Sequence, residues 1–109
     1  MGSKKTQDFD RLKDFKNKLS KKYRLKYLIL FGSRAKNKYK KSSDYDLLVV
    51  SQDFKGIEWK KRQISLYPLW DFNVFDQGAD FICYTPEEFE RLRKKSFLCK
   101  KAVEEGIEI

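Results

Sequence analysis

The chain has 109 residues, 40% hydrophobic and 16% aromatic, which predicts a single domain spanning residues 1–109 with its own core. Its 25 Lys and Arg outnumber 16 Asp and Glu, and the formal net charge of +9 either draws polyanions to the surface or simply marks a solvated basic surface. The chain has no His and only two Cys, which excludes a zinc finger and Cys/His catalysis. No apolar run comes near the roughly 20 residues that a membrane span needs, which excludes a membrane protein. We therefore expect a cytoplasmic protein without disulfides.

The first half of the chain predicts one helix and two strands. Apolar residues recur every three to four positions over residues 8–23, which predicts an amphipathic helix. The apolar run of residues 27–31 predicts a buried strand that stops at Gly32. Residues 34–43 are basic and polar and predict a short helical turn and a loop. Residues 44–50 end in a β-favouring run and predict the second strand.

The second half predicts a helix, a strand and a closing helix. Aromatic residues at helical spacing over residues 56–70 predict a helix that Pro68 ends or kinks. Residues 80–84 predict the third strand, and Thr85 follows as the N-cap of the closing helix, with Glu88 completing a capping box. This order of elements predicts an α/β or α+β fold, a small mixed sheet with helices packed on it.

Two carboxylates stand two positions apart at the start of the second strand. Side chains repeat their direction every second residue along a strand, so Asp44 and Asp46 point to the same face about 7 Å apart. Like charges placed this close repel each other, and a divalent cation between them would relieve the repulsion. Mg²⁺ is the natural ion for oxygen ligands and phosphates. The alternative is that Asp44 is a turn residue and Asp46 a solvent-facing strand residue.

A Gly-Ser pair follows the first predicted strand. Gly32 permits a tight turn and a close approach by a phosphate, and Ser33 offers a hydroxyl and a backbone N–H. Any strand can end in such a pair, so the pair alone is weak evidence. Ten residues separate it from Asp44, and the two features together favour a phosphate site next to a metal site.

In the segments F-G-S-R-A and S-D-Y-D-L the sequence resembles the nucleotidyltransferase superfamily that includes DNA polymerase beta, and within it the minimal nucleotidyltransferases of the antitoxin type. The resemblance implies a polymerase beta-like fold and an enzyme that uses ATP and two Mg²⁺ ions. It implies that three aspartates hold the metal ions and that the Gly-Ser turn and its neighbours hold the nucleotide. The candidate nucleotide-binding residues are Gly32, Ser33, Arg34 and Ser43.

The third carboxylate of that pattern has three candidates. We choose Asp80 because it begins the only later strand, and a rigid element would position it. Asp71 and Asp76 lie in a region interrupted by Pro68 and Gly78. The predicted metal ligands and catalytic residues are therefore Asp44, Asp46 and Asp80. Arg34 and Lys36 would neutralise phosphate charge or would instead be solvated loop residues.

The resemblance also implies an acceptor. Minimal members pair with a helical HEPN-type partner protein and, in toxin–antitoxin systems, transfer AMP to it. The alternatives are transfer of AMP to a small hydroxylated molecule, or an inactive module that binds nucleic acid or a partner protein. Nucleic acid is the less favoured partner, and a homodimer is a further option. Among the remaining features, Trp59, Tyr67 and Trp70 are expected in the core or an interface, and Cys83 in the core.

Overall fold

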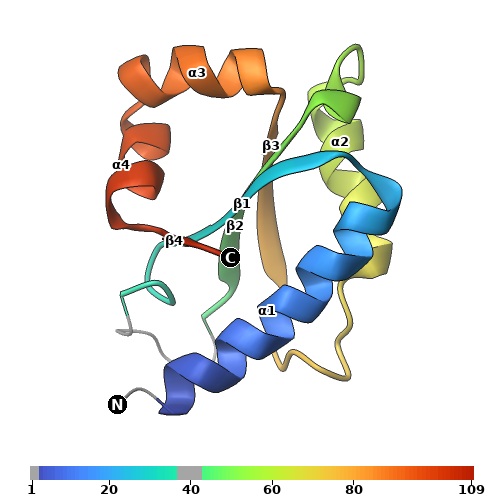
Figure 1. Cartoon of the computed structure of the whole chain (residues 1–109), viewed down its shortest axis with the longest axis vertical. Helices are drawn as coiled ribbons and strands as arrows, with labels where there is room; N and C mark the ends of the chain where they lie inside the picture. The colour runs from blue at the N-terminus through green and yellow to red at the C-terminus, as the bar shows by residue number, and fades with distance from the viewer. Residues whose placement is uncertain (1–2, 37–42) are drawn as a thin grey trace.

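The structure is a computed structural model that describes residues 3–36 and 43–109. Its four-stranded sheet has the order β3-β2-β1-β4 and carries helices on both faces (Figure 1). The strands are β1 (Leu25–Phe31), β2 (Tyr45–Ser51), β3 (Ala79–Tyr84) and β4 (Ile107–Glu108). The helices are α1 (Ser3–Lys22), α2 (Trp59–Leu66), α3 (Pro86–Lys95) and α4 (Phe97–Glu105), with short 3₁₀ turns η1 (Gln52–Phe54) and η2 (Tyr67–Leu69).

The pairing of the strands brings three chain segments together at one end of the sheet. β1 and β2 are antiparallel, so the last residue of β1, Phe31, pairs with Asp46 near the start of β2. β2 and β3 are parallel, so Asp46 also lies directly beside Asp80 near the start of β3. In Figure 1 the starts of β2 and β3 are at the lower end of the sheet. The turn after β1 therefore lies next to the first residues of both neighbouring strands.

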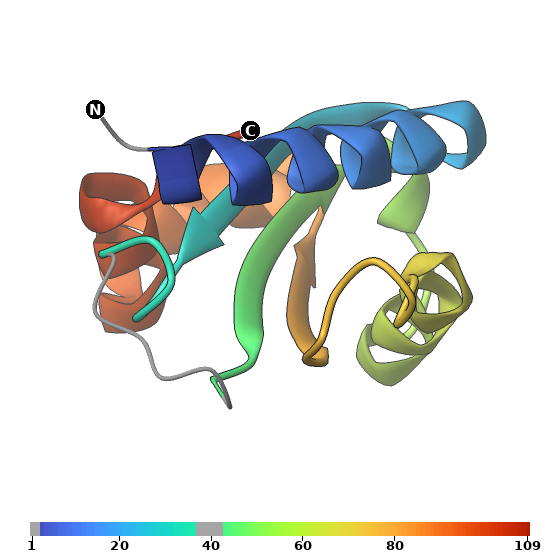
Figure 2. The same ribbon diagram turned by 90° about the horizontal axis from the view of Figure 1, so that it is seen from below.

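Each face of the sheet buries its own hydrophobic cluster. α1 lies across one face (Figure 2) and packs Leu12, Phe15 and Leu19 against alternate strand residues. α3 and α4 cover the opposite face, where Phe89, Cys99 and Ala102 meet the intervening strand residues. The strand residues on the α1 face include Leu28, Leu30, Leu47, Val49, Phe81 and Cys83, and those on the α3/α4 face include Ile29, Phe31, Leu48, Val50 and Tyr84. Because both faces are covered, the strands are apolar over continuous runs.

Most of the predicted elements are confirmed. The first helix, the three strands and the fold class agree with the structure. α2 stops at Leu66, and Pro68 lies in the 3₁₀ turn that follows, as expected of a residue that cannot continue a helix. The capping box of Thr85 and Glu88 is present. Of residues 34–43, Arg34 to Lys36 form a turn closed onto Gly32 O, and residues 37–42 lie outside the described residues.

The prediction of one closing helix is wrong. Ser96 has an extended backbone, ends α3 and begins α4, and its Oγ accepts a hydrogen bond from the Cys99 N–H at 3.3 Å. The break lets both short helices pack on the same face of the sheet, which one straight helix could not do. The sequence also did not reveal β4, whose two residues pair with Ile29 and Leu30 of β1. A strand of two residues is too short to show any periodicity.

The aromatic side chains divide between core and surface. Trp70 and Cys83 are buried, as predicted. Trp59 and Tyr67 remain exposed over 42% and 41% of their surface, so they are not core residues. No helix in residues 3–36 and 43–109 has the length and apolar character needed to cross a bilayer.

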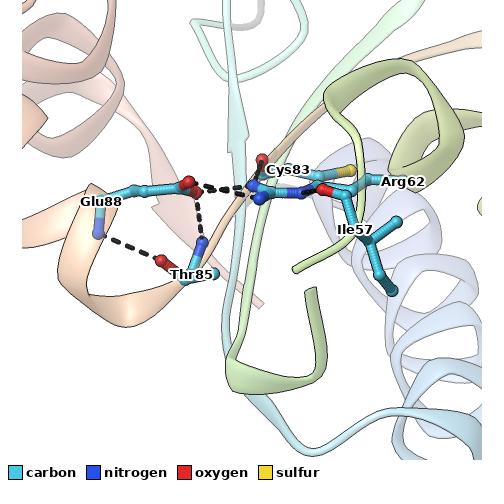
Figure 3. Close-up of polar contacts among 5 residues, drawn as sticks. All are labelled: Ile57, Arg62, Cys83, Thr85 and Glu88. Carbon is cyan, nitrogen blue, oxygen red and sulfur yellow. Dashed lines mark hydrogen bonds and ion pairs between the residues drawn. The ribbon is translucent and has the colours of Figure 1, made fainter. Parts of the chain in front are cut away.

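A buried arginine joins α2, β3 and α3 (Figure 3). Arg62 Nη1 and Nη2 donate to the two carboxylate oxygens of Glu88 at 2.6 and 3.2 Å. Arg62 also donates to the carbonyls of Ile57 at 2.8 Å and Cys83 at 3.2 Å. Glu88 in turn accepts from the Thr85 N–H at 2.8 Å, so one carboxylate serves both the ion pair and the capping box. This network holds the helices that flank β3 in place around the strand.

Candidate functional site

The three predicted carboxylates lie at the end of the sheet where β2 and β3 begin. Asp46 and Asp80 are register partners, so their side chains leave the sheet on the same face, the one that α3 and α4 cover. Asp44 precedes β2 and is held there because the Tyr45 N–H donates to Gly78 O at 2.9 Å. Asp44 and Asp80 are exposed, and Asp46 is half-buried. The sheet therefore positions Asp46 at the centre of an acidic group.

The neighbouring acidic side chains and burial both affect the Asp46 carboxylate. Its pKa is raised, first because burial penalises the charged carboxylate, then because of the negative charges of Asp80 and Asp44. A raised pKa means that the folded protein holds this carboxylate charged at a cost in free energy. A bound cation would remove that cost.

Gly32 makes room for the Asp46 carboxylate. Its φ is +75°, a left-handed conformation that residues with a side chain rarely adopt. A Cβ at this position would collide with Asp46 Oδ2. The tight turn predicted at Gly32 is therefore present, and it must lack a side chain because the Asp46 carboxylate lies against it. The approach of a phosphate to Gly32 stays a prediction.

The Gly-Ser turn opens into a cavity of about 490 Å³. This volume is within the usual range for small-molecule and cofactor sites. The cavity is lined by Phe31, Gly32, Ser33, Lys36, Asp46, Leu98, Lys101 and Glu105. The structure thus places Gly32, Ser33 and Asp46 in one hollow. The contribution of α4 was missed from the sequence, because no local pattern shows that a helix more than 60 residues away in the chain covers this turn.

The prediction that Arg34 is a solvated loop residue is wrong. Its side chain is buried, and its Nε and Nη2 donate to Ser43 O at 3.0 and 2.8 Å. Its Nη1 donates to Tyr45 Oη at 2.9 Å, and the guanidinium lies 4.0 Å from the centre of that ring. Arg34 therefore ties the Gly-Ser turn to the residues that lead into β2. Arg34 and Ser43 are not among the described residues that line the cavity.

The fold separates two of the three candidates for the third carboxylate, Asp71 and Asp80. Asp71 lies in a separate hollow beside α1 with Arg11 and Phe15, and its Oδ1 accepts from the Asn73 N–H at 2.8 Å. It belongs to the opposite side of the sheet from Asp46. Asp80, by contrast, is directly adjacent to Asp46.

The donor set suits a hard divalent cation. Asp44, Asp46 and Asp80 offer only carboxylate oxygens, the ligands that Mg²⁺ prefers. In the described parts of the chain, no three acidic or cysteine side chains are already close enough to hold one ion, so the carboxylates would have to turn towards it. The raised pKa of Asp46 fits a cation bound beside this carboxylate.

Comparison with known proteins agrees with this geometry. The family model described as a nucleotidyltransferase domain matches residues 12–109. A protein from Sulfolobus solfataricus assigned as a nucleotidyltransferase is 20% identical, with a TM-score of 0.61 over 89% of this chain and 74% of that one. A toxin–antitoxin structure with AMP-PNP is 22% identical, with a TM-score of 0.53 over 95% of this chain and 70% of that one. No curated protein matches significantly. Since the matched residues include the Gly-Ser turn and all three aspartates, the chain belongs to the nucleotidyltransferase domain family.

Proposed function

We propose that this chain transfers a nucleoside monophosphate, AMP from ATP, to an acceptor hydroxyl, and that residues 1–109 form one transferase domain. The observation that carries the proposal is the shared cavity of Gly32, Ser33 and Asp46, next to Asp80 in the sheet. Asp44, Asp46 and Asp80 would hold Mg²⁺, and the Gly-Ser turn would hold the triphosphate. When bound, Mg²⁺ neutralises phosphate charge and lowers the pKa of an oxygen nucleophile.

The residues of the chain have distinct parts in this reaction. The hydroxyl and backbone N–H of Ser33 donate to phosphate oxygens, and Lys36 Nζ lies in the same cavity to balance their charge. The acceptor oxygen forms a bond to the α-phosphorus, and the bond between that phosphorus and the bridging oxygen breaks. Pyrophosphate leaves with the electron pair, and the Asp80 carboxylate takes the proton of the acceptor hydroxyl.

We further propose that the acceptor is a partner protein of the HEPN type in a toxin–antitoxin pair. One structural neighbour is a toxin–antitoxin structure with AMP-PNP. Several large apolar side chains are exposed and suit a protein interface; they include Ile64, Phe72 and Phe97, at 63%, 66% and 76% exposure. A small hydroxylated molecule is the second candidate acceptor.

Label transfer tests the proposal. The protein is incubated with Mg²⁺, ATP labelled at the α-phosphate, and either a purified HEPN-type partner or a set of small hydroxylated compounds. We expect label on the acceptor, none from ATP labelled at the γ-phosphate, and loss of transfer with chelator. Asp46→Asn and Asp80→Asn should abolish transfer, whereas Asp71→Asn should not, because Asp71 lies in another hollow.

The outcomes separate the candidate functions. Label on the partner supports the protein acceptor, and label on a small molecule replaces it with the second candidate. Transfer from the γ-phosphate contradicts a nucleotidyltransferase. Binding of nucleic acid that weakens with salt, persists in Asp46→Asn and occurs without any transfer would favour the inactive binding module.

A further inference from the structure

Helix α4 contributes two charged side chains to the candidate nucleotide cavity. Lys101 and Glu105 line it together with Lys36 from the turn after β1. Lys36 Nζ lies 2.6 Å from Glu105 Oε1, and Lys101 Nζ lies 3.9 Å from Glu105 Oε2. One carboxylate is thus shared by two ammonium groups from two segments of the chain, inside the same hollow as Ser33 and Asp46.

Stability of α4 does not account for this arrangement. Glu105 is the last residue of the helix, where the exposed carbonyls disfavour a negative charge. The side chains of Lys36, Lys101 and Glu105 are exposed over 44%, 47% and 38% of their surface. Ion pairs with this much exposure contribute little to stability. The pKa of Glu105 is lowered, first by its hydrogen bond with Lys36 and further by the charge of Lys101, so it stays an anion at neutral pH.

An anion held between two lysines resembles a phosphate site in its charge pattern. Phosphate oxygens bind ammonium groups as a carboxylate does, and a triphosphate carries more negative charge than one carboxylate. The cavity of about 490 Å³ already contains the Gly-Ser turn that would hold the triphosphate. A phosphate chain seated on Ser33 would therefore lie within the same hollow as both lysines and would be repelled by Glu105.

We propose that Lys101 binds the β- and γ-phosphates of the nucleoside triphosphate, and that Glu105 occupies their place between Lys36 and Lys101 until the nucleotide arrives. This inference rests on the proposed function, since it assumes that a triphosphate binds at the Gly-Ser turn. The exchange favours triphosphates, because a nucleoside monophosphate has no further phosphates with which to displace Glu105. It also makes α4 part of the nucleotide site.

Equilibrium binding of α,β-methylene-ATP with Mg²⁺ tests this inference, because this analogue cannot be cleaved at the α-phosphate. By titration calorimetry we expect Lys101→Ala to weaken binding by about tenfold, as for the loss of one charge-assisted bond. Lys100→Ala is the matched control: Lys100 is the exposed neighbour on α4, lies outside the described cavity lining, and its loss changes the net charge equally. It should change the Kd by less than twofold. Lys101→Arg should retain most of the affinity.

The Glu105→Gln variant tests whether Glu105 competes with the nucleotide. Removing the competing carboxylate should tighten binding of the analogue by several-fold, while AMP affinity changes less in every variant. Equal Kd values for Lys101→Ala and Lys100→Ala, or weaker binding in Glu105→Gln, would overturn the inference. In that case the proposed function stands if the wild-type protein still binds the analogue and labels an acceptor. Absence of analogue binding in the wild-type protein would contradict both proposals.

Discussion

The Asp46 carboxylate fills the space that a side chain on Gly32 would need. Oδ2 of Asp46 faces the Gly32 Cα so closely that a Cβ there would collide with it, and the φ of +75° adds backbone strain for any other residue. The turn at Gly32 and the start of β2 at Asp46 therefore fit together only without a side chain on Gly32. A substitution at Gly32 tests the role of this contact.

Replacing Gly32 with Ala should displace the Asp46 carboxylate and abolish nucleotidyl transfer. Gly56→Ala is the matched control, because Gly56 has a φ of +78° but no atom of residues 3–36 and 43–109 lies within 4 Å of the added Cβ. Backbone strain alone should cost each variant about 1–2 kcal/mol of unfolding free energy. Urea denaturation and label transfer per folded molecule measure the two effects. Retention of full transfer by Gly32→Ala would contradict the close-approach argument.

The Asp46→Asn variant should be inactive yet more stable than the wild-type protein when no divalent cation is present. Burial and the charges of Asp80 and Asp44 raise the pKa of Asp46, so its ionised form destabilises the fold at neutral pH. The amide removes that charge with little change in shape. Thermal unfolding in chelator at pH 7 should show a midpoint higher by a few degrees. Asp10→Asn, an exposed change on α1, should leave the midpoint unaltered.

The stability that Asp46→Asn gains over the wild type should decrease as the pH falls. The penalty of ionised Asp46 is complete above its folded pKa and disappears as the pH falls below its unfolded pKa of about 3.9. The midpoints of Asp46→Asn and wild type should therefore converge near pH 3. Added Mg²⁺ should raise the midpoint of the wild type more than that of the variant. A variant that is less stable at pH 7 in chelator would refute the argument.

Removal of the buried guanidinium of Arg62 should destabilise the protein strongly. Arg62→Ala breaks the bonds to Glu88, Ile57 O and Cys83 O, and it leaves Glu88 without its cation. Breaking a buried ion pair costs about 3–5 kcal/mol, and because Glu88 keeps some contact with solvent we expect about 3 kcal/mol. Arg93→Ala removes an exposed pair with Glu90 at 3.5 Å and should cost under about 0.5 kcal/mol. Urea denaturation compares the two.

Acid should remove the benefit of the Arg62–Glu88 pair. The pKa of Glu88 is lowered, first by its hydrogen bonds from Arg62. Its contribution to stability is therefore present above the unfolded pKa of about 4.3 and is lost as the pH falls through the lower folded pKa. The difference in unfolding free energy between wild type and Arg62→Ala should shrink below pH 4. A difference that stays constant down to pH 2 would show that packing, not charge, dominates.

The Cys83 thiol should be unreactive in the native protein. Burial raises its pKa to about 12, partly offset by the charge of Arg62. At pH 8 the thiolate fraction is then on the order of 1 in 10,000. In a Cys99→Ser variant, a thiol reagent should label Cys83 only as fast as the protein opens, and labelling should become rapid in urea. Rapid labelling of the folded variant would show that the strand is accessible.

Local patterns were sufficient to predict the three strands that position the predicted carboxylates and the Gly-Ser turn. The apolar runs of β1, β2 and β3 and the capping box at Thr85 depend on residues close together in the chain, and all are observed. The spacing of the Gly-Ser pair from Asp44 and Asp46 also favoured a phosphate site next to a metal site. In the structure, the antiparallel pairing of β1 and β2 brings the end of one strand to the start of the next.

Other features depended on partners distant in the chain. Arg34 and Arg62 look like surface residues in the sequence, but each is buried because a carbonyl, ring or carboxylate from another segment satisfies it. Neither composition nor periodicity records such long-range compensation.

The sequence by itself indicated the family, the positions of the aspartates at the starts of strands and the tight turn at Gly32, since these follow from local spacing and backbone sterics. Only the tertiary structure decided what surrounds the turn. The packing of α4 against β1 brings Lys101 and Glu105 to Lys36 across more than 60 residues of chain. Their meeting depends on how the apolar face of α4 packs against the sheet, and packing of that kind leaves no signal in the spacing of the charged residues themselves.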